Sequence, residues 1–190
     1  MRWTQDDVLA AAFATLEQEG LEGLSLRGVA RVLGAHLNSV SWYVKTKASL
    51  IETMADAIVG SVGVDELPAD PVERVRTVIG RYRLAMLSHR DGGRLVAGTF
   101  TGTGKTLRVG EVIVGGLLEA GYGEAEAARL CWALVYFTLG LTQEQQTSGP
   151  ESPVDLDGYP ALAKVGEQLL LKDSFDARFD FGVARLLRLG

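Results

Sequence analysis

The sequence predicts an all-α protein. Apolar residues recur at helical spacing along most of the 190 residues, and no stretch alternates convincingly with a period of two. Hydrophobic residues make up 47% of the chain and charged residues 23%, which is enough apolar material for a sizeable core. We therefore expect an N-terminal three-helix domain over residues 1–46, a connecting helix over 47–62 and a larger helical domain over 63–190.

The first predicted helix spans residues 5–19. Thr4 is a good N-cap, and Asp6 and Asp7 place negative charge in the first turn, where the helix dipole favours it. Gly20 follows the last periodic residue, as is typical of a helix end. We expect this helix to pack behind the next two.

Two short helices joined by a tight turn come next. The first begins after Ser25, a good N-cap, and ends at Gly34, because glycine accepts the left-handed backbone of a C-terminal cap. The second spans residues 37–43 and carries small polar side chains suited to base edges. This pattern predicts a helix-turn-helix that reads DNA, although helices with alternating arginines are also found in merely solvated hairpins.

The charge of this segment favours the DNA interpretation. Residues 23–51 contain no Asp or Glu and four basic residues, a local charge of +4 in a chain of net charge −5. Neutralisation of phosphates by Lys and Arg supplies most of the sequence-independent affinity for a duplex, so a concentrated basic patch outweighs the net charge. The four basic residues are Arg27, Arg31, Lys45 and Lys47.

Helical segments separated by Gly- and Pro-rich breaks make up the remainder of the chain. Pro71 suits the first turn of a helix, where its missing N–H is not needed. The predicted order is the connecting helix, a linker over 60–71, a helix over 71–87, a Gly/Thr-rich segment over 91–104, a helix ending at Gly121, a helix over 124–145, a loop over 147–158 and two helices ending near Leu189.

The helix over 124–145 is apolar on every side. One stripe consists of Ala127, Leu130, Leu134, Phe137 and Leu141, while Trp132, Val135, Tyr136 and Leu139 occupy the remaining faces. Such a helix must be covered all round, by its own domain and by a second subunit, so we expect a homodimer. The natural partner in a four-helix interface is the last helix, with Phe175, Phe179, Val183 and Leu186 or Leu187. A fully buried core helix is the competing interpretation.

Membrane and secreted proteins are disfavoured. The longest apolar run, residues 130–141, is shorter than the ~20 residues that a bilayer span needs. The polar, acidic start of the sequence is unlike a secretory signal, so we expect a cytoplasmic protein. Cys131 is the single cysteine and is expected to be buried in the core.

The sequence contains no complete motif of the common enzyme classes considered below. The GTGKT run over 102–106 would complete a phosphate loop if residue 99 were glycine, but the nearest glycine is Gly98. Neither G-x-S-x-G nor H-E-x-x-H occurs. We expect His89 to have a structural role at a helix end and Asp91 to cap the next helix. The sequence therefore predicts no catalytic activity, no cofactor and no metal site.

Motifs in both halves resemble the TetR family of bacterial one-component repressors, in particular its tetracycline-repressor branch. In the N-terminal half they are Gly20, LSLRGVARVLG over 24–34 and WYVKTK over 42–47. In the C-terminal half they are AMLSHRDGGRLVAGT over 85–99 and YFTLG over 136–140. The resemblance implies a homodimer whose N-terminal helix-turn-helix binds a palindromic operator in double-stranded DNA and whose C-terminal domain binds a ligand and dimerises.

Position by position, the resemblance also implies the DNA contacts. Leu37 stands where the family's base-reading glutamine stands, and Ser41 replaces a tyrosine that contacts the DNA backbone, so a different operator is expected. The implied base-facing residues are Leu37, Asn38, Ser39 and, towards a guanine, Arg27, and the implied backbone contacts are Ser41, Trp42, Tyr43 and Lys47.

The implied ligand pocket departs further from the family pattern. Val96 and Tyr136 stand where two histidines of the tetracycline repressors hold a drug-bound magnesium, and Val78 and Val112 replace two drug-binding amides. We therefore expect a hydrophobic, aromatic or polycyclic inducer bound without magnesium, whose binding moves the helix over 47–62. The expected lining is Val78, Tyr82, Val96, Thr99, Phe100, Val112, Tyr136 and Glu144.

Two other functions stay open at this point: a DNA-binding regulator without a small-molecule inducer, and a small-molecule carrier or enzyme that uses the C-terminal pocket. A regulator without an inducer does not explain why the chain has a large helical domain with an apolar, glycine-rich centre. A carrier or enzyme does not explain the basic segment over residues 23–51. The sequence therefore favours a repressor released by a ligand.

Overall fold

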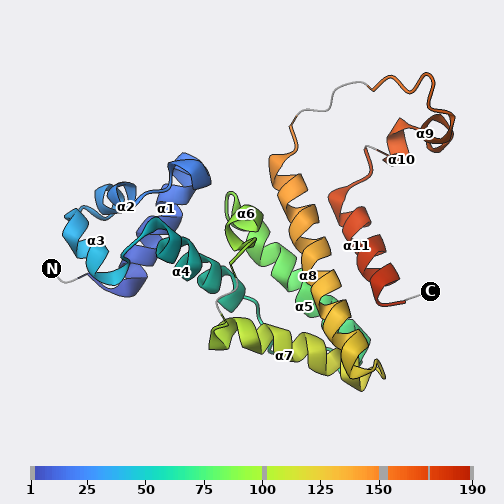
Figure 1. Cartoon of the computed structure of the whole chain (residues 1–190), viewed down its shortest axis with the longest axis horizontal. Helices are drawn as coiled ribbons and strands as arrows, with labels where there is room; N and C mark the ends of the chain where they lie inside the picture. Colours follow the sequence, from blue (N-terminus) through green and yellow to red (C-terminus); the bar gives the residue numbers. More distant parts are fainter. Residues whose placement is uncertain (1–2, 100–101, 150–153, 171, 189–190) are drawn as a thin grey trace.

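The computed structural model describes residues 3–99, 102–149, 154–170 and 172–188 of the chain. Every regular element within these residues is a helix, which confirms the predicted all-α class. Figure 1 shows a small N-terminal cluster of helices connected by α4 (Lys47–Gly60) to a larger C-terminal group. None of the described helices is both long and apolar enough to cross a membrane.

The N-terminal cluster consists of α1 (Gln5–Gly23), α2 (Leu26–Leu33) and α3 (Leu37–Tyr43), which pack on one another. The Thr4 side chain accepts a hydrogen bond from the backbone in the first turn of α1, as its N-cap role predicts. Gly20 has a φ of +70° and interrupts the helical geometry of α1, so the predicted end at this glycine corresponds to a kink.

Both ends of α2 have the predicted caps. The Ser25 Oγ accepts from the Gly28 N–H at 3.1 Å, and Gly34 adopts the left-handed conformation with φ +65°. The buried side chains of Val29 and Val40 anchor the two helices to the core. The outer faces of α2 and α3 are left exposed.

The larger group begins with α5. Its N-cap is Asp70, and Pro71 lies in its first turn, as predicted. It contains α5 (Pro71–Leu87), α6 (Gly92–Val96), α7 (Gly104–Glu119), α8 (Glu124–Thr147), α9 (Pro160–Val165), α10 (Glu167–Leu170) and α11 (Phe175–Leu186). In this group α5 packs against α6, α7 and α8, and α11 packs against α8. The sequence did not predict α6 within its Gly/Thr-rich segment, and it predicted two final helices where the structure has three.

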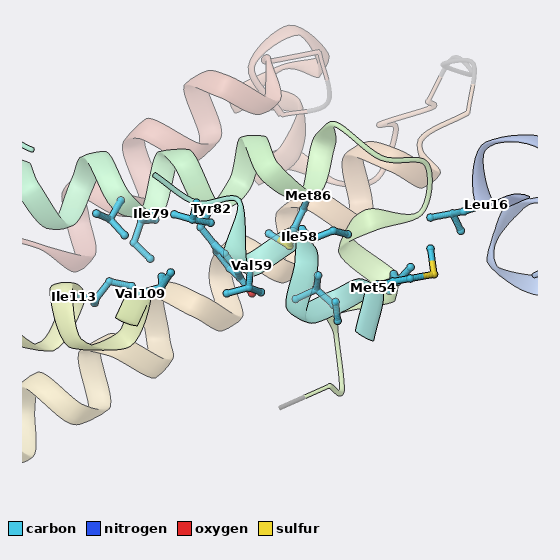
Figure 2. Packing of buried hydrophobic residues seen from close by; sticks show 14 of the residues in the cluster. Leu16, Met54, Ile58, Val59, Ile79, Tyr82, Met86, Val109 and Ile113 are labelled. Atoms are coloured by element: carbon cyan, nitrogen blue, oxygen red, sulfur yellow. The ribbon is translucent and has the colours of Figure 1, made fainter. Parts of the chain in front are cut away.

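One continuous core runs through both groups. Figure 2 shows it extending from Leu16 of α1, past Met54 and Ile58 of α4, to Met86 of α5 and Ile113 of α7. All five side chains are at most 2% exposed. The N-terminal cluster is therefore coupled to the C-terminal group by apolar packing along α4.

The buried stripe of α8 differs from the prediction. Ala127, Leu130 and Leu134 are buried, but the stripe continues through Thr138 and Thr142, while Phe137 and Leu141 are half-buried. Both threonines tolerate burial because their hydroxyls donate to the carbonyls four residues earlier, at 2.7 Å.

The contact of α8 with α11 depends on a glycine. A Cβ at Gly182 of α11 would overlap the ring of Phe137 on α8. The missing side chain lets this ring lie directly against α11, where it also stacks on Phe179. A buried arginine, Arg83 of α5, adds a polar connection by donating to Asp176 of α11 at 2.7 Å.

Candidate DNA-reading surface and ligand cavity

The helix-turn-helix presents most of its predicted contact residues to solvent. Arg27, Leu37, Asn38, Trp42 and Lys47 are exposed. Ser39, Ser41 and Tyr43 are half-buried. We call these eight residues the reading surface. The structure therefore brings all of the predicted DNA-contact residues together at the end of the molecule formed by α2, α3 and the start of α4.

Two of these residues also hold the N-terminal cluster together. The Tyr43 hydroxyl donates to the backbone carbonyl of Trp3. The Lys47 ammonium donates to the carbonyls of Leu21 and Glu22 at 3.0 and 3.1 Å, at the end of α1. Cations are favoured at helix C-termini, so Lys47 stabilises the end of α1 as well as adding positive charge to the surface.

The two arginines of α2 differ in their surroundings. Arg31 forms an ion pair with Glu19 of α1, which offsets part of its charge. Arg27 is exposed and has no ion pair within the described ranges of the chain. Arg27 is therefore the α2 arginine whose charge is directly available to a phosphate or a base.

A cavity of about 790 Å³ lies in the C-terminal group. Its volume falls in the range typical of small-molecule sites. It is lined by α4, α5, α7 and α8, by Val96 at the end of α6 and by the segment that follows it, and Figure 2 shows Tyr82 of α5 beside Val59 of α4 in this region. The described lining residues are Ala55, Asp56, Val59, Tyr82, Val96, Gly98, Thr99, Thr106, Leu107, Val109, Gly110, Glu111, Ile113, Val114, Ala128, Cys131, Trp132, Val135, Tyr136 and Leu139.

Four of the residues predicted for the pocket line this cavity, namely Tyr82, Val96, Thr99 and Tyr136. Three others lie elsewhere. Val78 is completely enclosed by the core, Val112 packs half-buried on the core, and Glu144 is exposed further along α8. Phe100 lies outside the described residues.

Sequence reasoning missed the contribution of α4 to the cavity. Ala55, Asp56 and Val59 occupy one side of this helix and line the cavity, whereas none of the pocket residues predicted from the sequence lies on this helix. Cys131 was expected in the core, but it is half-buried and also lines the cavity. No local signal distinguishes a residue that faces a cavity from one that faces the core, because both environments favour apolar side chains.

The polar groups of the cavity are few. The Asp56 carboxylate accepts from the Thr103 hydroxyl and lies 3.7 Å from the Lys105 ammonium. Burial raises the pKa of the Tyr82 phenol well above its ordinary value and also raises the pKa of the Cys131 thiol. Both groups therefore stay neutral near pH 7. Within the described chain, no group of three or more His, Cys, Asp or Glu residues is placed to hold a metal ion.

A polar junction connects α1 with the turn between α5 and α6. The Asp91 carboxylate accepts from the Leu21 N–H at 2.8 Å, and the Arg90 guanidinium donates to the Glu17 carbonyl at 3.0 Å. His89 stacks on Phe13 of α1 with 4.2 Å between ring centroids. Asp91 is the N-cap residue of α6, as expected, but its side chain makes no cap bond there and reaches α1 instead.

Comparisons with known proteins agree with this arrangement. Residues 67–188 match the family described as "Tetracyclin repressor-like, C-terminal domain". The chain is 30% identical to the tetracycline repressor protein class E of Escherichia coli over 191 residues, which covers 98% of this chain and 90% of that protein.

Solved structures show the same similarity. A possible TetR family transcriptional regulator from Streptomyces coelicolor A3(2) superposes with a TM-score of 0.84 at 32% identity, covering 97% of both chains. A single-residue variant of TetR from Acinetobacter baumannii AYE, in complex with minocycline, superposes with a TM-score of 0.78 at 25% identity, covering 98% of this chain and 95% of that one.

Proposed function

Since the chain belongs to the TetR family of transcriptional regulators, we propose that it is a homodimeric repressor of the cytoplasm. Residues 1–46 bind a palindromic operator, the helix over 47–62 connects the domains, and residues 63–190 dimerise and bind the inducer. The inducer is a hydrophobic, aromatic or polycyclic small molecule held without magnesium. The observation that carries the proposal is that α4 begins at the reading surface and lines the cavity with Ala55, Asp56 and Val59.

The exposed residues of α2 and α3 support the DNA-binding part. Arg27 is available for a bidentate contact with a guanine, and Leu37, which is 36% exposed, suits the methyl group of a thymine. An ammonium has three donors, and Lys47 uses two of them on α1, so one remains for a phosphate. Lys47 then fixes the position of α1 and contacts the DNA backbone at the same time.

The cavity supports the ligand part. Its lining is mostly aliphatic and aromatic, and it includes Val96 and Tyr136, which by resemblance stand in the positions of the two histidines of the tetracycline repressors' magnesium site. An inducer that fills this cavity touches α4 directly. A shift of α4 would move the reading surface, and a displacement of a few ångströms disturbs half-site spacing of about 34–36 Å.

Exposed aromatic residues on α8 and α11 support dimerisation. Trp132 and Tyr136 of α8 stack on each other and are 46% and 63% exposed, and Phe181 of α11 is 64% exposed. Large aromatic side chains are enriched in protein interfaces. The two helices pack side by side (Figure 1), so a second copy would complete a four-helix interface.

Selection from a library of random DNA duplexes tests the proposal. The purified full chain is expected to enrich one palindrome at two salt concentrations, with weaker binding at the higher salt. The selected duplex is then challenged with a panel of aromatic natural products and, separately, with tetracycline and magnesium. Release by an aromatic compound is the expected result. Failure to select any sequence contradicts the repressor function, and magnesium-dependent release by tetracycline contradicts the inducer class.

The dimer has its own test. Phe181→Asp is expected to give a monomer in sedimentation velocity, because a charge would be buried in the interface. Leu118→Asp on α7 is the matched control, since Leu118 is also exposed, at 43%, but lies outside α8 and α11. A dimer that survives Phe181→Asp unchanged places the interface elsewhere.

A further inference from the structure

The charged groups that line the cavity are all of one sign within the described residues. Asp56 and Glu111 contribute carboxylates, and no Lys, Arg or His side chain is part of the described lining. Charge interactions are stronger beside apolar walls than in water. A ligand with a negative group would therefore meet repulsion, while a ligand with a hydrogen-bond donor would meet an acceptor.

Asp56 is the carboxylate that faces this apolar environment. Its side chain is 20% exposed and lies on α4, with Ala55 and Val59 beside it in the lining. One carboxylate oxygen accepts from the Thr103 hydroxyl. A carboxylate has about four acceptor positions, so capacity remains for a donor inside the cavity.

Lys105 compensates only part of this charge. Its ammonium is 3.7 Å from the second carboxylate oxygen, and its side chain is 59% exposed. The aliphatic stem lies against Gly60 of α4, where a Cβ would overlap it, so Lys105 runs along the flank of the helix. An ion pair with one partner largely in water is weak, and a donor inside the cavity can share or replace it.

The other polar groups do not supply an equivalent acceptor. Glu111 is exposed on α7, so water screens its charge. The Tyr82 phenol is neutral because burial raises its pKa. Tyr82 can donate to or accept from a ligand but gives no preference for charge.

We propose that Asp56 determines the ligand class of the cavity, and that the ligand is an aromatic compound with a hydrogen-bond donor, a phenolic hydroxyl or an ammonium group, and not an organic anion. This inference rests on the proposed function, because it takes the cavity as the inducer site. Hydrogen bonds to a charged acceptor are roughly twice as strong as neutral ones. One such contact therefore gives ligands of similar shape different affinities.

Three naphthalene probes that differ in one substituent test the proposal: 1-naphthylmethylamine, 1-naphthol and 1-naphthoate. Their Kd values are measured at pH 7 by calorimetry with the full chain and without DNA. The amine and the naphthol are expected to bind at least about tenfold more tightly than the carboxylate. Asp56→Asn is expected to reduce the preference for amine over carboxylate by about tenfold. Glu52→Gln, one turn earlier on α4, exposed and outside the lining, is the matched control and should leave the preference unchanged.

A second variant covers the case in which Asp56→Asn fails to fold. Lys105→Gln removes the competing ammonium and is expected to tighten amine binding while weakening carboxylate binding. Equal or tighter binding of naphthoate, a preference that persists in Asp56→Asn, or no binding by any probe would each overturn the inference. If an operator is selected but no probe binds, this inference fails and the DNA-binding function stands. If Asp56-dependent binding is found but no operator is selected, the repressor proposal fails instead.

Discussion

The reading surface and the cavity lie towards the two ends of α4 and differ in the sign of their charge. Residues 23–51 carry four basic residues and no acidic one, whereas the charged groups in the described cavity lining are the carboxylates Asp56 and Glu111. The first region suits a polyanion and the second disfavours anions. The net charge of −5 therefore does not reveal that the chain carries two local fields of opposite sign.

Several contacts among the described residues join these regions, and two of these connections are large. The first is α4, which passes from Lys47 at the reading surface to Val59 at the cavity. The second is the junction between α1 and the α5–α6 turn, formed by His89, Arg90 and Asp91. Since the two regions bind separate ligands in the proposed function, changes confined to one region should leave the other region's binding intact, and changes in a connection should alter the coupling.

The largest effect is expected at Gly92, at the start of α6. A Cβ there would overlap the backbone carbonyl oxygen of Met86, which cannot move without distorting the α5–α6 turn. Gly92→Ala should therefore lower the free energy of unfolding by about 3 kcal/mol. Gly80→Ala on α5 is the control, because nothing lies within 4 Å of its Cβ position and alanine is the better helix former. It should raise stability by about 0.5–1 kcal/mol. Urea unfolding measures the free energy of unfolding of both variants. Equal values would show that the α5–α6 turn shifts to accept the added Cβ.

The two regions also differ in how far the sequence predicts them. The caps and turn of the helix-turn-helix depend on neighbours in the chain, and Ser25 and Gly34 have the predicted geometry. The surface roles of Lys47 and Tyr43 were inferred, but their bonds to α1 and to Trp3 just before it were not, because they join residues 25 to 40 positions apart.

The cavity has no comparable local signal. Its lining comes from five helices and a connecting segment between residues 55 and 139. Resemblance to the family located Tyr82, Val96, Thr99 and Tyr136, but it also suggested Val78, which is enclosed in the core. A valine that faces the core and a valine that faces a cavity have the same spacing in the sequence. Asp56 was missed because its role depends on where Thr103 and Lys105 lie in space.

The next effect tests the reading surface alone. Arg27→Ala should weaken operator binding by about 10- to 100-fold, as expected for loss of a bidentate contact with a guanine. Arg31→Ala is the matched control on the same helix and should change affinity by about threefold or less, because Glu19 already pairs with Arg31. Fluorescence anisotropy on the selected duplex measures both. Neither change should alter binding of the naphthalene probes, and an effect of Arg27→Ala on those probes would contradict the separation of the two regions.

A smaller effect is expected for the junction. The Arg90 guanidinium donates to the carbonyls of Glu17 and Gln18, and its backbone N–H donates to the Glu17 carboxylate. Arg90→Ala removes the side-chain bonds and should reduce the ratio of operator affinities without and with inducer by about fivefold. The affinity for each ligand alone should stay close to that of the unmodified chain. If both single affinities change and their ratio does not, the junction is merely structural.

The smallest effect is the acid sensitivity of the same junction. His89 stacks on Phe13, and its burial lowers its pKa below the ordinary value, while the nearby Glu17 carboxylate acts in the opposite direction. Well above pH 7 the imidazole is neutral in the folded and in the unfolded chain, so it contributes nothing to the pH dependence of the free energy of unfolding. As the pH falls below about 6.5 the unfolded chain binds the proton first, so the free energy of unfolding should decrease until the folded-state pKa is reached.

Carboxylates also titrate in acid, so the His89 contribution requires a difference measurement. The loss of stability between pH 7.5 and pH 5.5 should be smaller in His89→Gln than in the unmodified chain. His36, the other histidine of the sequence, is exposed before α3, and His36→Gln serves as the control. An equal loss in His89→Gln and in the unmodified chain would mean that burial and Glu17 cancel, and a larger loss in His89→Gln would mean that attraction to Glu17 outweighs burial. In the second case acid would tighten the junction between the reading surface and the cavity instead of loosening it.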